Sequence, residues 1–383
     1  MLKGTIIKII LVVLLAFVLR VLFLDSTPPG LYVDEAAIGY NAYTISHTGR
    51  DEHGHILPLF LESYGTFTSG LVVYFVAVQD WSLRITPVIL GTLSVLVMII
   101  LASKYLKSMR DGIRAGLILA LAPSHVLWSR AFYEPTLGLL LFLIGLCRND
   151  WLQMLFLSLS IYAYQPLRLI SYIYLFMLVI QKKITLKNLF LFIVTQIPMF
   201  YLSLQPGPNS RALTLLWWNI VPHNLFSILR EFLSQYLAYL SPSNLFWYPD
   251  PDLQRSLPLL SVFSSFWLIR SLYVLLPMER KVAWNTGYRE LFLYLNKQNK
   301  LAVVDVDKPV YILKLFYDKY IPSNLAFRPL NWKEDLCQDQ LIVGTDLLVS
   351  ENQAREHFLD FKAKFEPNLV VYSTNPLKKC KIR

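Results

Sequence analysis

The chain has 383 residues and a formal net charge of +10 at pH 7, yet only 16% of its residues are charged and 55% are hydrophobic. This composition excludes an ordinary soluble protein. It also argues against a nucleic-acid-binding protein, because no stripe of Lys and Arg with interleaved aromatic residues lies in a polar segment. The three cysteines, Cys147, Cys337 and Cys380, lack the CxxC spacing of a zinc site or a disulfide framework.

The first predicted element is an apolar run from Ile6 to Leu24, with Lys3 and Lys8 at its start. A spanning helix needs about 17–20 such residues. Arg20, near the outer end of the run, is expected to extend to the membrane interface. No small-residue cleavage site follows, so the run is predicted to be an uncleaved helix rather than a signal peptide.

An acidic segment follows directly, from Pro28 to Gly65. Its acids include two adjacent pairs, Asp34–Glu35 and Asp51–Glu52. Polar and aromatic residues are interleaved with them, namely Tyr32, Tyr40, Asn41, Tyr43, Arg50, His53, His55 and Glu62. Acids where a chain leaves a bilayer can act on a substrate whose head group lies at the interface. The alternative is a solvated loop whose charges only keep it soluble.

Six more apolar segments follow before residue 205. They are predicted as spans over Ile85–Leu106, Ile113–Trp128, Thr136–Leu146, Trp151–Tyr164, Leu169–Ile180 and Ile184–Leu204. Basic clusters at 104–114 and 182–187 mark the cytoplasmic ends, so the loop over residues 25–84 is predicted to lie outside the plasma (inner) membrane. Within that loop, Thr68–Gln79 is too short to span and is predicted to lie along the interface.

A second outer segment, residues 205–257, is rich in Trp, Tyr and Pro. Leu225–Leu240 within it has the spacing of an amphipathic helix. Leu257–Met278 is predicted as an eighth span although Arg270 within it costs ~2.5–3.5 kcal/mol. The predicted fold for residues 1–278 is therefore a polytopic α-helical membrane domain with about eight spans.

Residues 279–383 have the composition of a soluble domain. Strands are predicted over Ala302–Val306, Gln340–Gly344 and Leu369–Ser373, and helices over Trp284–Asn299, Pro309–Tyr320 and Glu351–Phe365. This alternation predicts a small α/β domain with a largely parallel sheet. Eight spans from a cytoplasmic N-terminus would leave it in the cytoplasm, and the sequence leaves its side of the membrane open.

Four outer segments resemble one known family. DEAAIGYNAY (34–43), TGRDEHG (48–54) and LPLFLESYG (57–65) resemble the first outer loop of bacterial GT-C glycosyltransferases of family 39, which includes protein O-mannosyltransferases and aminoarabinose transferases. SRAFYEPTLGLLLFLIG (129–145), YQPLR (164–168) and DPDLQRSLP (250–258) are similar to later segments. The chain departs from the family in two ways. Thr66–Gly70 stands where members show Lys-Pro, and the helical region is shortened after about Arg270.

The resemblance implies a GT-C-like fold and transfer of a sugar from a polyprenyl-phosphate donor, with inversion, to an acceptor at the outer face. In the family the acid corresponding to Asp34 is the base that activates the acceptor, and Glu35 and Glu134 would be further acidic members of the site. The donor phosphate would be bound by Arg130, Tyr164, Arg168 and Arg255. The loop motif comprises Tyr40, Asn41, Arg50, Asp51 and Glu52. The resemblance leaves the acceptor open among protein, lipid and glycan, and in the family the domain after the helices is extracytoplasmic.

Each assignment has a structural alternative. Asp34 has the residue type of a helix N-cap, and Arg50 can form a local ion-pair cluster with Asp51 and Glu52. An Arg130–Glu134 pair at i,i+4 is a common helix ion pair. Arg255 can anchor a lipid head group.

Other readings of the sequence concern metal and function class. His53 and His55 flank acids at a spacing that can share one divalent metal ion, although solvated clusters of this kind are common and no metal or cofactor is assigned. The alternative to a transferase is a catalytically impaired, shortened relative that binds lipid or assists assembly. A transporter ranks third, because Arg270 is a weak match to the broken, ionisable spans of that class.

Overall fold

The computed structural model describes residues 2–28, 30–63, 66–77, 83–131, 134–203, 224–240, 287–298, 300–304, 313, 315–316, 325–327, 338–345, 354, 359–365 and 369–374. The chain divides into two compact units. The first comprises Met1–Thr27 with Asn41–Leu276, and the second comprises Pro28–Tyr40 with Pro277–Arg383.

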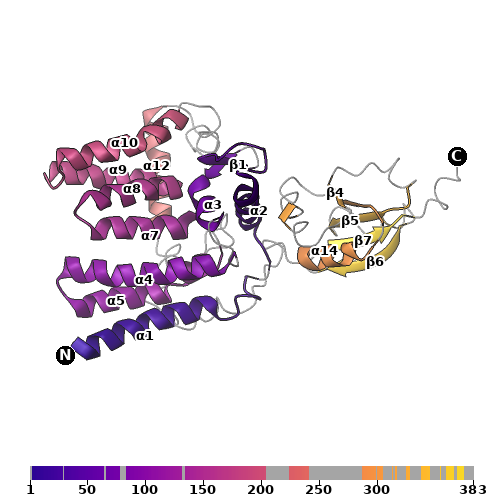
Figure 1. Cartoon of the computed structure of the whole chain (residues 1–383), viewed down its shortest axis with the longest axis horizontal. Coiled ribbons are helices and arrows are strands. Elements are labelled where there is room, and N and C mark those ends of the chain that lie inside the picture. The colour runs from indigo at the N-terminus through magenta and orange to yellow at the C-terminus, as the bar shows by residue number, and fades with distance from the viewer. Residues whose placement is uncertain are drawn as a thin grey trace. The chain divides into compact units, whose positions relative to one another are not determined.

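Helices make up most of the first unit (Figure 1). They are α1 (Leu2–Val21), α4 (Ile85–Leu106), α5 (Met109–Leu121), α6 (Pro123–Trp128), α7 (Glu134–Cys147), α8 (Trp151–Ala163), α9 (Gln165–Ile180) and α10 (Leu186–Ser203). Each of the seven apolar segments predicted before residue 205 is thus helical. The second half of the third segment starts anew at Pro123, which fits the first turn of α6 because it needs no N–H partner there.

Two helices are long and apolar enough to cross a membrane, Lys3–Val21 and Ile85–Leu106. The other apolar helices, α7 to α10, fall short by length or composition. The predicted eighth span over Leu257–Met278 lies outside the described residues. The described part of the chain is therefore mostly helical with two candidate membrane spans, rather than the eight predicted.

The α4–α5 pair is held together by two glycines of α5. A Cβ added to Gly112 would lie 1.8 Å from the Ser103 hydroxyl oxygen and 2.6 Å from the Ile99 carbonyl oxygen of α4. A Cβ at Gly116 would lie 2.2 Å from a side-chain carbon of Ile99. This G-x-x-x-G spacing lets the backbones approach closely, as small residues do between membrane helices.

The two ends of the helical unit differ in charge. At one end, called the basic end, the turns 106–109 and 147–151 lie together, because the Lys104 ammonium donates to the Cys147 carbonyl (3.0 Å) and the Asn149 side chain (3.1 Å). The basic residues at this end are Lys104, Lys107, Arg110, Arg114, Arg148, Lys182, Lys183 and Lys187. The opposite end, called the loop end, comprises the end of α1, the segment 49–77, the turn 129–131 and the α8–α9 junction.

Within the first unit, the part of the segment before α4 that starts at Asn41 folds onto the loop end. It contains the second half of α2 (Val33–Thr48), the antiparallel strands β1 (Phe60–Ser63) and β2 (Thr66–Ser69), and α3 (Gly70–Ala77). The interfacial element predicted over Thr68–Gln79 is thus a strand end followed by a short helix. Phe60 packs into a cluster with α8, α9 and α10, and the Ser69 hydroxyl donates to the Tyr162 carbonyl.

The amphipathic helix predicted over Leu225–Leu240 is confirmed as α12 (Leu225–Leu240). Its apolar face is open, since five large apolar side chains are exposed: Phe226, Leu229, Phe232, Leu233 and Leu237. An open apolar face beside charged residues is typical of a helix that lies in a membrane interface.

The second unit has a five-stranded sheet in the order β4-β3-β5-β7-β6. The strands are β3 (Ala302–Val304), β4 (Leu325–Phe327), β5 (Leu341–Thr345), β6 (Asp360–Phe365) and β7 (Leu369–Ser373). β3 pairs in parallel with β4 and β5, whereas β7 pairs antiparallel with β5 and β6. The sheet is therefore mixed, and the prediction of a largely parallel sheet was wrong.

The predicted helix over Glu351–Phe365 is also wrong at its end, because residues 360–365 form β6. Charged residues alternate there as Asp360, Lys362 and Lys364, which is the period of an edge strand with a solvated face. β6 and β7 follow one another closely in the chain and pair antiparallel. Because the sequence predicted a helix in place of β6, this antiparallel part of the sheet was not predicted.

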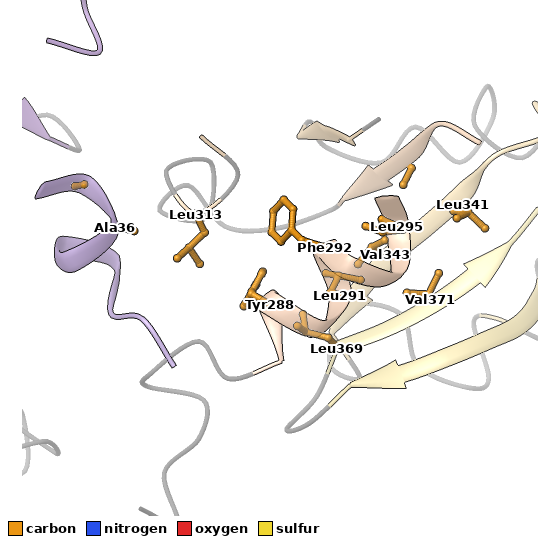
Figure 2. Packing of buried hydrophobic residues seen from close by; sticks show 12 residues of the cluster. Ala36, Tyr288, Leu291, Phe292, Leu295, Leu313, Leu341, Val343, Leu369 and Val371 are labelled. Carbon is orange, nitrogen blue, oxygen red and sulfur yellow. The ribbon is translucent and has the colours of Figure 1, made fainter. Parts of the chain in front are cut away.

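The core of the second unit lies between the sheet and α14 (Tyr288–Asn296) (Figure 2). Leu291 and Phe292 of α14 face Leu341, Val343, Leu369 and Val371 of the sheet, all fully or nearly fully buried. Ala36 and Ala37, from the start of α2, belong to the same cluster.

Candidate functional site

Asp51 organises a tight turn at the loop end. Its carboxylate accepts hydrogen bonds from the backbone N–H groups of His53 (3.0 Å) and His55 (2.8 Å), and its second oxygen lies 3.2 Å from the His55 imidazole. Arg50 donates instead to the Gly54 carbonyl (2.8 Å). The predicted ion-pair cluster is thus replaced by an Asx-type turn, in which Asp51 mainly stabilises the loop.

Asn41 joins the second half of α2 to this turn. Its side-chain oxygen accepts a hydrogen bond from the Glu52 backbone N–H (2.9 Å). The Glu52 side chain is only 3% exposed, and its carboxylate lies 3.9 Å from the His53 imidazole. Of the two acids in the loop motif, Asp51 uses its carboxylate to accept the hydrogen bonds of the turn. The side chain of Glu52 is buried in the first unit, and its backbone N–H is bound by Asn41.

Tyr74 of α3 was not predicted as a member of this region. Its hydroxyl donates to the Pro58 carbonyl (2.7 Å). Burial raises the pKa of Tyr74, and the nearby Asp51 carboxylate raises it further. The phenol therefore stays protonated at neutral pH and fixes the chain just before β1. Only the aromatic character of the segment could have signalled it.

No group of three His, Cys, Asp or Glu side chains within the described ranges is placed to hold a metal ion. His53 and His55 have their rings 6.2 Å apart, and His55 is engaged by Asp51.

Asp34 and Glu35 lie in the first turn of α2, within the second unit. The Glu35 carboxylate accepts a hydrogen bond from the Tyr32 backbone N–H (3.0 Å) and is fully buried. This is the return bond of a capping box, with Tyr32 at the cap position. Asp34 is therefore inside the helix rather than its N-cap, and it is half-buried. Tyr40 is partly buried and packs against the core of the second unit.

Arg130 is wholly buried, and its five N–H groups all serve backbone carbonyls at the end of α1. The acceptors are the carbonyls of Leu19 (3.2 Å), Arg20 (3.0 Å), Phe23 (3.0 Å) and, twice, Thr27 (3.2 and 2.7 Å). The carbonyls of Leu19 and Arg20 belong to the last turn of α1 and lack partners within the helix, whereas the Phe23 carbonyl also accepts from the backbone N–H groups of Ser26 and Thr27. Burial lowers the pKa of Arg130 to about 10, with a contribution from the Arg84 cation. Arg130 thus caps α1 and makes no ion pair with Glu134 in the part of the chain that the structure describes.

Arg20 is also buried, although the sequence predicted that it extends to the interface. Its guanidinium donates to the carbonyls of Ala16 (2.8 Å) and Ala120 (3.2 Å) and lies 2.6 Å from the His125 ring nitrogen Nδ1. Carbonyls left open by the break between α5 and α6 explain this position. Gly91 of α4 makes room for it, since a Cβ there would lie 3.1 Å from the Arg20 Nε.

Glu134 and Tyr164 lie at neighbouring helix ends. Glu134 is the first residue of α7, and Tyr164 precedes α9 at its N-cap position. A Cβ added to Gly138, one turn into α7, would lie 2.7 Å from the Tyr164 Cβ. The two predicted segments around them therefore meet at the loop end.

Arg168 lies in the first turn of α9 and differs from Arg130, whose whole guanidinium is used by backbone carbonyls. Its guanidinium carbon is 5.4 Å from the centre of the Phe60 ring. Its Nε is buried and makes no hydrogen bond. One and two turns further along the same helix face, Tyr172 is 41% and Phe176 65% exposed. A guanidinium whose buried Nε–H has no acceptor thus adjoins an exposed apolar face.

An apolar groove of about 520 Å³ lies elsewhere on the helical unit. It is lined by Met98, Leu101, Ala102 and Tyr105 of α4, Phe142 and Leu146 of α7, and Ile170, Ile173, Tyr174 and Met177 of α9. At about 100° per residue, these α9 residues face away from Arg168. The groove is therefore separate from the candidate site, and the remaining predicted residue, Arg255, lies outside the described ranges.

Comparison with models of known protein families and with curated protein sequences gave no match to this chain.

Proposed function

We propose that the chain is a membrane glycosyltransferase of the GT-C type, which moves a sugar from a polyprenyl-phosphate donor to an acceptor at the outer face of the plasma (inner) membrane. The observation that supports it best is the combination at Arg168 of a buried Nε without an acceptor, which Arg20 shares, with exposed apolar side chains along the same helix face. A buried guanidinium N–H without an acceptor is costly, and a phosphate oxygen is a suitable partner for it.

The surroundings of Arg168 fit an amphiphilic phosphate. The N-terminus of α9 adds the positive end of a helix dipole, which favours an anion. Tyr172 and Phe176 offer an apolar path along the same face for a lipid tail. A ligand with a phosphate head and a polyprenyl tail satisfies both features at once, whereas a soluble sugar phosphate would leave the apolar face unused.

In the proposed reaction, the removal of the proton from the acceptor hydroxyl is assigned to Asp34 by the resemblance alone, because Asp34 and Arg168 belong to different units. The acceptor oxygen forms a bond to the anomeric carbon while the bond from that carbon to the phosphate oxygen breaks, with inversion. The departing phosphate keeps the electron pair, and the Arg168 cation stabilises the charge that develops on it. Arg130 has no role in this step, because its donors are used by the end of α1.

The proposal includes a membrane position for the shorter helices. Each of the helices α7 to α10 runs between the basic end and the loop end, as the two candidate spans α1 and α4 do. The two clusters of basic residues, 104–114 and 182–187, both lie at the basic end, which is the pattern of a cytoplasmic face.

The direct test is release of free polyprenyl phosphate from a radiolabelled mixture of polyprenyl-phosphate sugars, with membranes containing the wild type, Asp34→Asn or Arg168→Gln. We expect Asp34→Asn to lose turnover and keep donor binding, and Arg168→Gln to lose both. Arg110→Gln, which removes one exposed cation at the basic end, is the matched control and should be as active as the wild type. Wild-type release at background level, with folded protein and a donor pool that a known transferase can use, would exclude the enzyme.

One observation favours a second candidate, a lipid-binding or assembly protein without activity. Where the family shows Lys-Pro, this chain has β2 followed by Gly70, whose N–H donates to the Leu59 carbonyl (2.9 Å). A Cβ there would lie 2.6 Å from that carbonyl oxygen. The segment Thr66–Gly70 therefore packs tightly against the backbone at Leu59, and it contains no Lys or Arg that could bind a phosphate. Donor binding that depends on Arg168 but gives no release would select this candidate.

A further inference from the structure

The apolar groove between α4, α7 and α9 has the lining of a site for a hydrocarbon chain. Its volume of about 520 Å³ is in the range of small-molecule sites, about 300–1,000 Å³. The lining extends over residues 98–105 of α4 and 170–177 of α9, each about 10 Å long at 1.5 Å per residue. Tyr105 and Tyr174 carry hydroxyl groups, whereas the other lining side chains are apolar. A sugar or a nucleotide would lose its hydrogen bonds to water there, and an alkyl chain has none to lose.

The groove opens on the outer surface of the helical unit. Phe142 of α7 and Tyr174 of α9 are partly buried and meet edge to face, with ring centres 6.5 Å apart, so they form part of its floor. Tyr105, Ile173 and Met177 at its rim are 58%, 51% and 48% exposed. An apolar chain can therefore enter the groove from the side, which in the proposed membrane position is the bilayer.

One end of the groove lies beside a cation. Tyr105, which lines the groove, is in the last turn of α4 and thus at the basic end. The Lys104 ammonium is 5.9 Å from the centre of the Tyr105 ring. Two of its three N–H donors serve the Cys147 carbonyl and the Asn149 side chain. The third remains for a ligand at the mouth of the groove.

The charge at this mouth favours an anion. Two acids lie near it on the basic end, and both are used by neighbouring arginines, Asp111 by Arg114 and Asp150 by Arg148. Within the described ranges Lys104 has no carboxylate partner, and the further cations of the basic end raise the positive potential around it. A phosphate oxygen is a suitable acceptor for its remaining N–H group.

We infer that the groove binds one acyl chain of an anionic phospholipid from the cytoplasmic leaflet, with the lipid phosphate at Lys104. This ligand is distinct from the polyprenyl-phosphate donor proposed for Arg168, which lies at the loop end. A second copy of the chain is a poorer occupant, because in the same membrane orientation it would bring its own basic end against Lys104. The inference depends on the proposed membrane position but not on glycosyl transfer.

The acyl-chain site can be mapped with phosphatidylglycerol that carries a photoreactive diazirine in one acyl chain, in phosphatidylcholine vesicles that contain the full chain. After irradiation, peptide mass spectrometry should find adducts concentrated at residues 98–105 and 170–177. Ile173→Trp fills the groove from its rim and should remove most of these adducts. Ile193→Trp, at a position of α10 that is 54% exposed, is the matched control and should label like the wild type.

A second variant guards against misfolding of the first. Ala102→Phe fills the groove from α4 and should also remove the adducts, while flotation with the vesicles shows that each variant is inserted. Adducts spread equally over α4, α9 and α10 in the wild type would mean that only mobile bilayer lipid contacts the groove. A wild type that floats with the vesicles but gives no adducts there would mean that protein covers the groove. Either result would overturn the inference.

Competition tests the head group. Unlabelled phosphatidylglycerol should displace the photoreactive lipid about fivefold better than phosphatidylcholine does, since one basic residue near a membrane surface contributes about 1 kcal/mol. Lys104→Gln should abolish this preference. Arg110→Gln is the matched control and should keep it, because α5 packs on a different face of α4, at Ile99 and Ser103. Equal displacement by the two lipids in the wild type, or displacement by inorganic phosphate, would overturn the assignment.

The same vesicles separate this inference from the proposed activity. Asp34→Asn should lose release of polyprenyl phosphate and yet label the groove like the wild type. A wild type without release that still gives the groove adducts would contradict the transferase and support the lipid site. A chain that does not float with the vesicles would overturn both the membrane position and the lipid site.

Discussion

At the scale of single residues, two arginines of the loop end differ in what their guanidinium groups contact. Arg130 donates five hydrogen bonds to carbonyls at the end of α1. Arg168 lies over an aromatic ring and leaves a buried N–H unsatisfied. Both were predicted to bind phosphate, but only Arg168 has a donor to offer without breaking the fold.

Arg130→Ala should therefore destabilise the protein. It would leave several buried carbonyls without donors, each costing about 1–3 kcal/mol, so we expect a total loss of about 3 kcal/mol or more. Thermal denaturation in detergent micelles measures it, with Arg110→Ala as the exposed control. If Arg130→Ala melts like the wild type and only donor binding is lost, Arg130 contacts the donor rather than capping α1.

A second residue-scale prediction concerns alkaline pH. Burial raises the pKa of Tyr288 from 10.0 to about 12. The raised value means that the unfolded chain loses this proton first, so the contribution to stability is complete below pH 10 and is lost as the pH rises to about 12. The difference amounts to about 2–3 kcal/mol at most.

Tyr288→Phe should make the stability of the C-terminal domain less dependent on pH between 10 and 12. Protease sensitivity of that domain, measured at several pH values, reports the change. Tyr294→Phe, one and a half turns further along α14, is the matched control. Equal alkaline sensitivity in the wild type and Tyr288→Phe would contradict the assignment.

At the scale of elements, the α4–α5 pair gives the clearest prediction. Gly112→Ala would place a Cβ 2.6 Å from the Ile99 carbonyl oxygen, a backbone atom that cannot rotate away. Overpacking of this kind costs about 1–3 kcal/mol, and we expect a matching fall in melting temperature. Gly4→Ala in α1, where nothing lies within 4 Å, should change little. Equal stability of the two variants would mean that the helices are not in close contact at Gly112.

The elements that the sequence predicted well are those with a strong periodic signal. All seven apolar runs predicted before residue 205 are helical, and α12 was predicted from its amphipathic spacing, whereas α2 was not predicted. β6 was missed because Asp360–Phe365 continues a polar stretch whose period-2 alternation covers only six residues. The site was harder to predict. The roles of Asp51 and Arg130 depend on which backbone groups come within reach, and motif spacing does not contain that information.

At the scale of the whole chain, the membrane position proposed for the helical unit has a consequence for bilayer thickness, because the helices of this unit differ in length. α4 has 22 residues, whereas α7 has 14 and α8 has 13. At about 1.5 Å per residue, these lengths are about 33, 21 and 20 Å. A bilayer of about 30 Å matches α4 and exceeds the others, so in the proposed membrane position the bilayer would thin beside the short helices or polar groups would cover their ends.

We therefore expect the protein to be more stable in thin bilayers. Mismatch costs fractions of a kcal/mol per Å, and a difference of about 10 Å at two helices should be measurable as a shift in melting temperature. The comparison is between vesicles of phosphatidylcholine with 14-carbon and with 22-carbon chains, at equal lipid-to-protein ratio. The helical unit should melt at the higher temperature in the 14-carbon lipid, while the C-terminal domain, followed through its protease sensitivity, serves as the internal control. A higher melting temperature in the 22-carbon lipid would show that the short helices do not face the hydrocarbon core, and the membrane part would then reduce to α1 and α4.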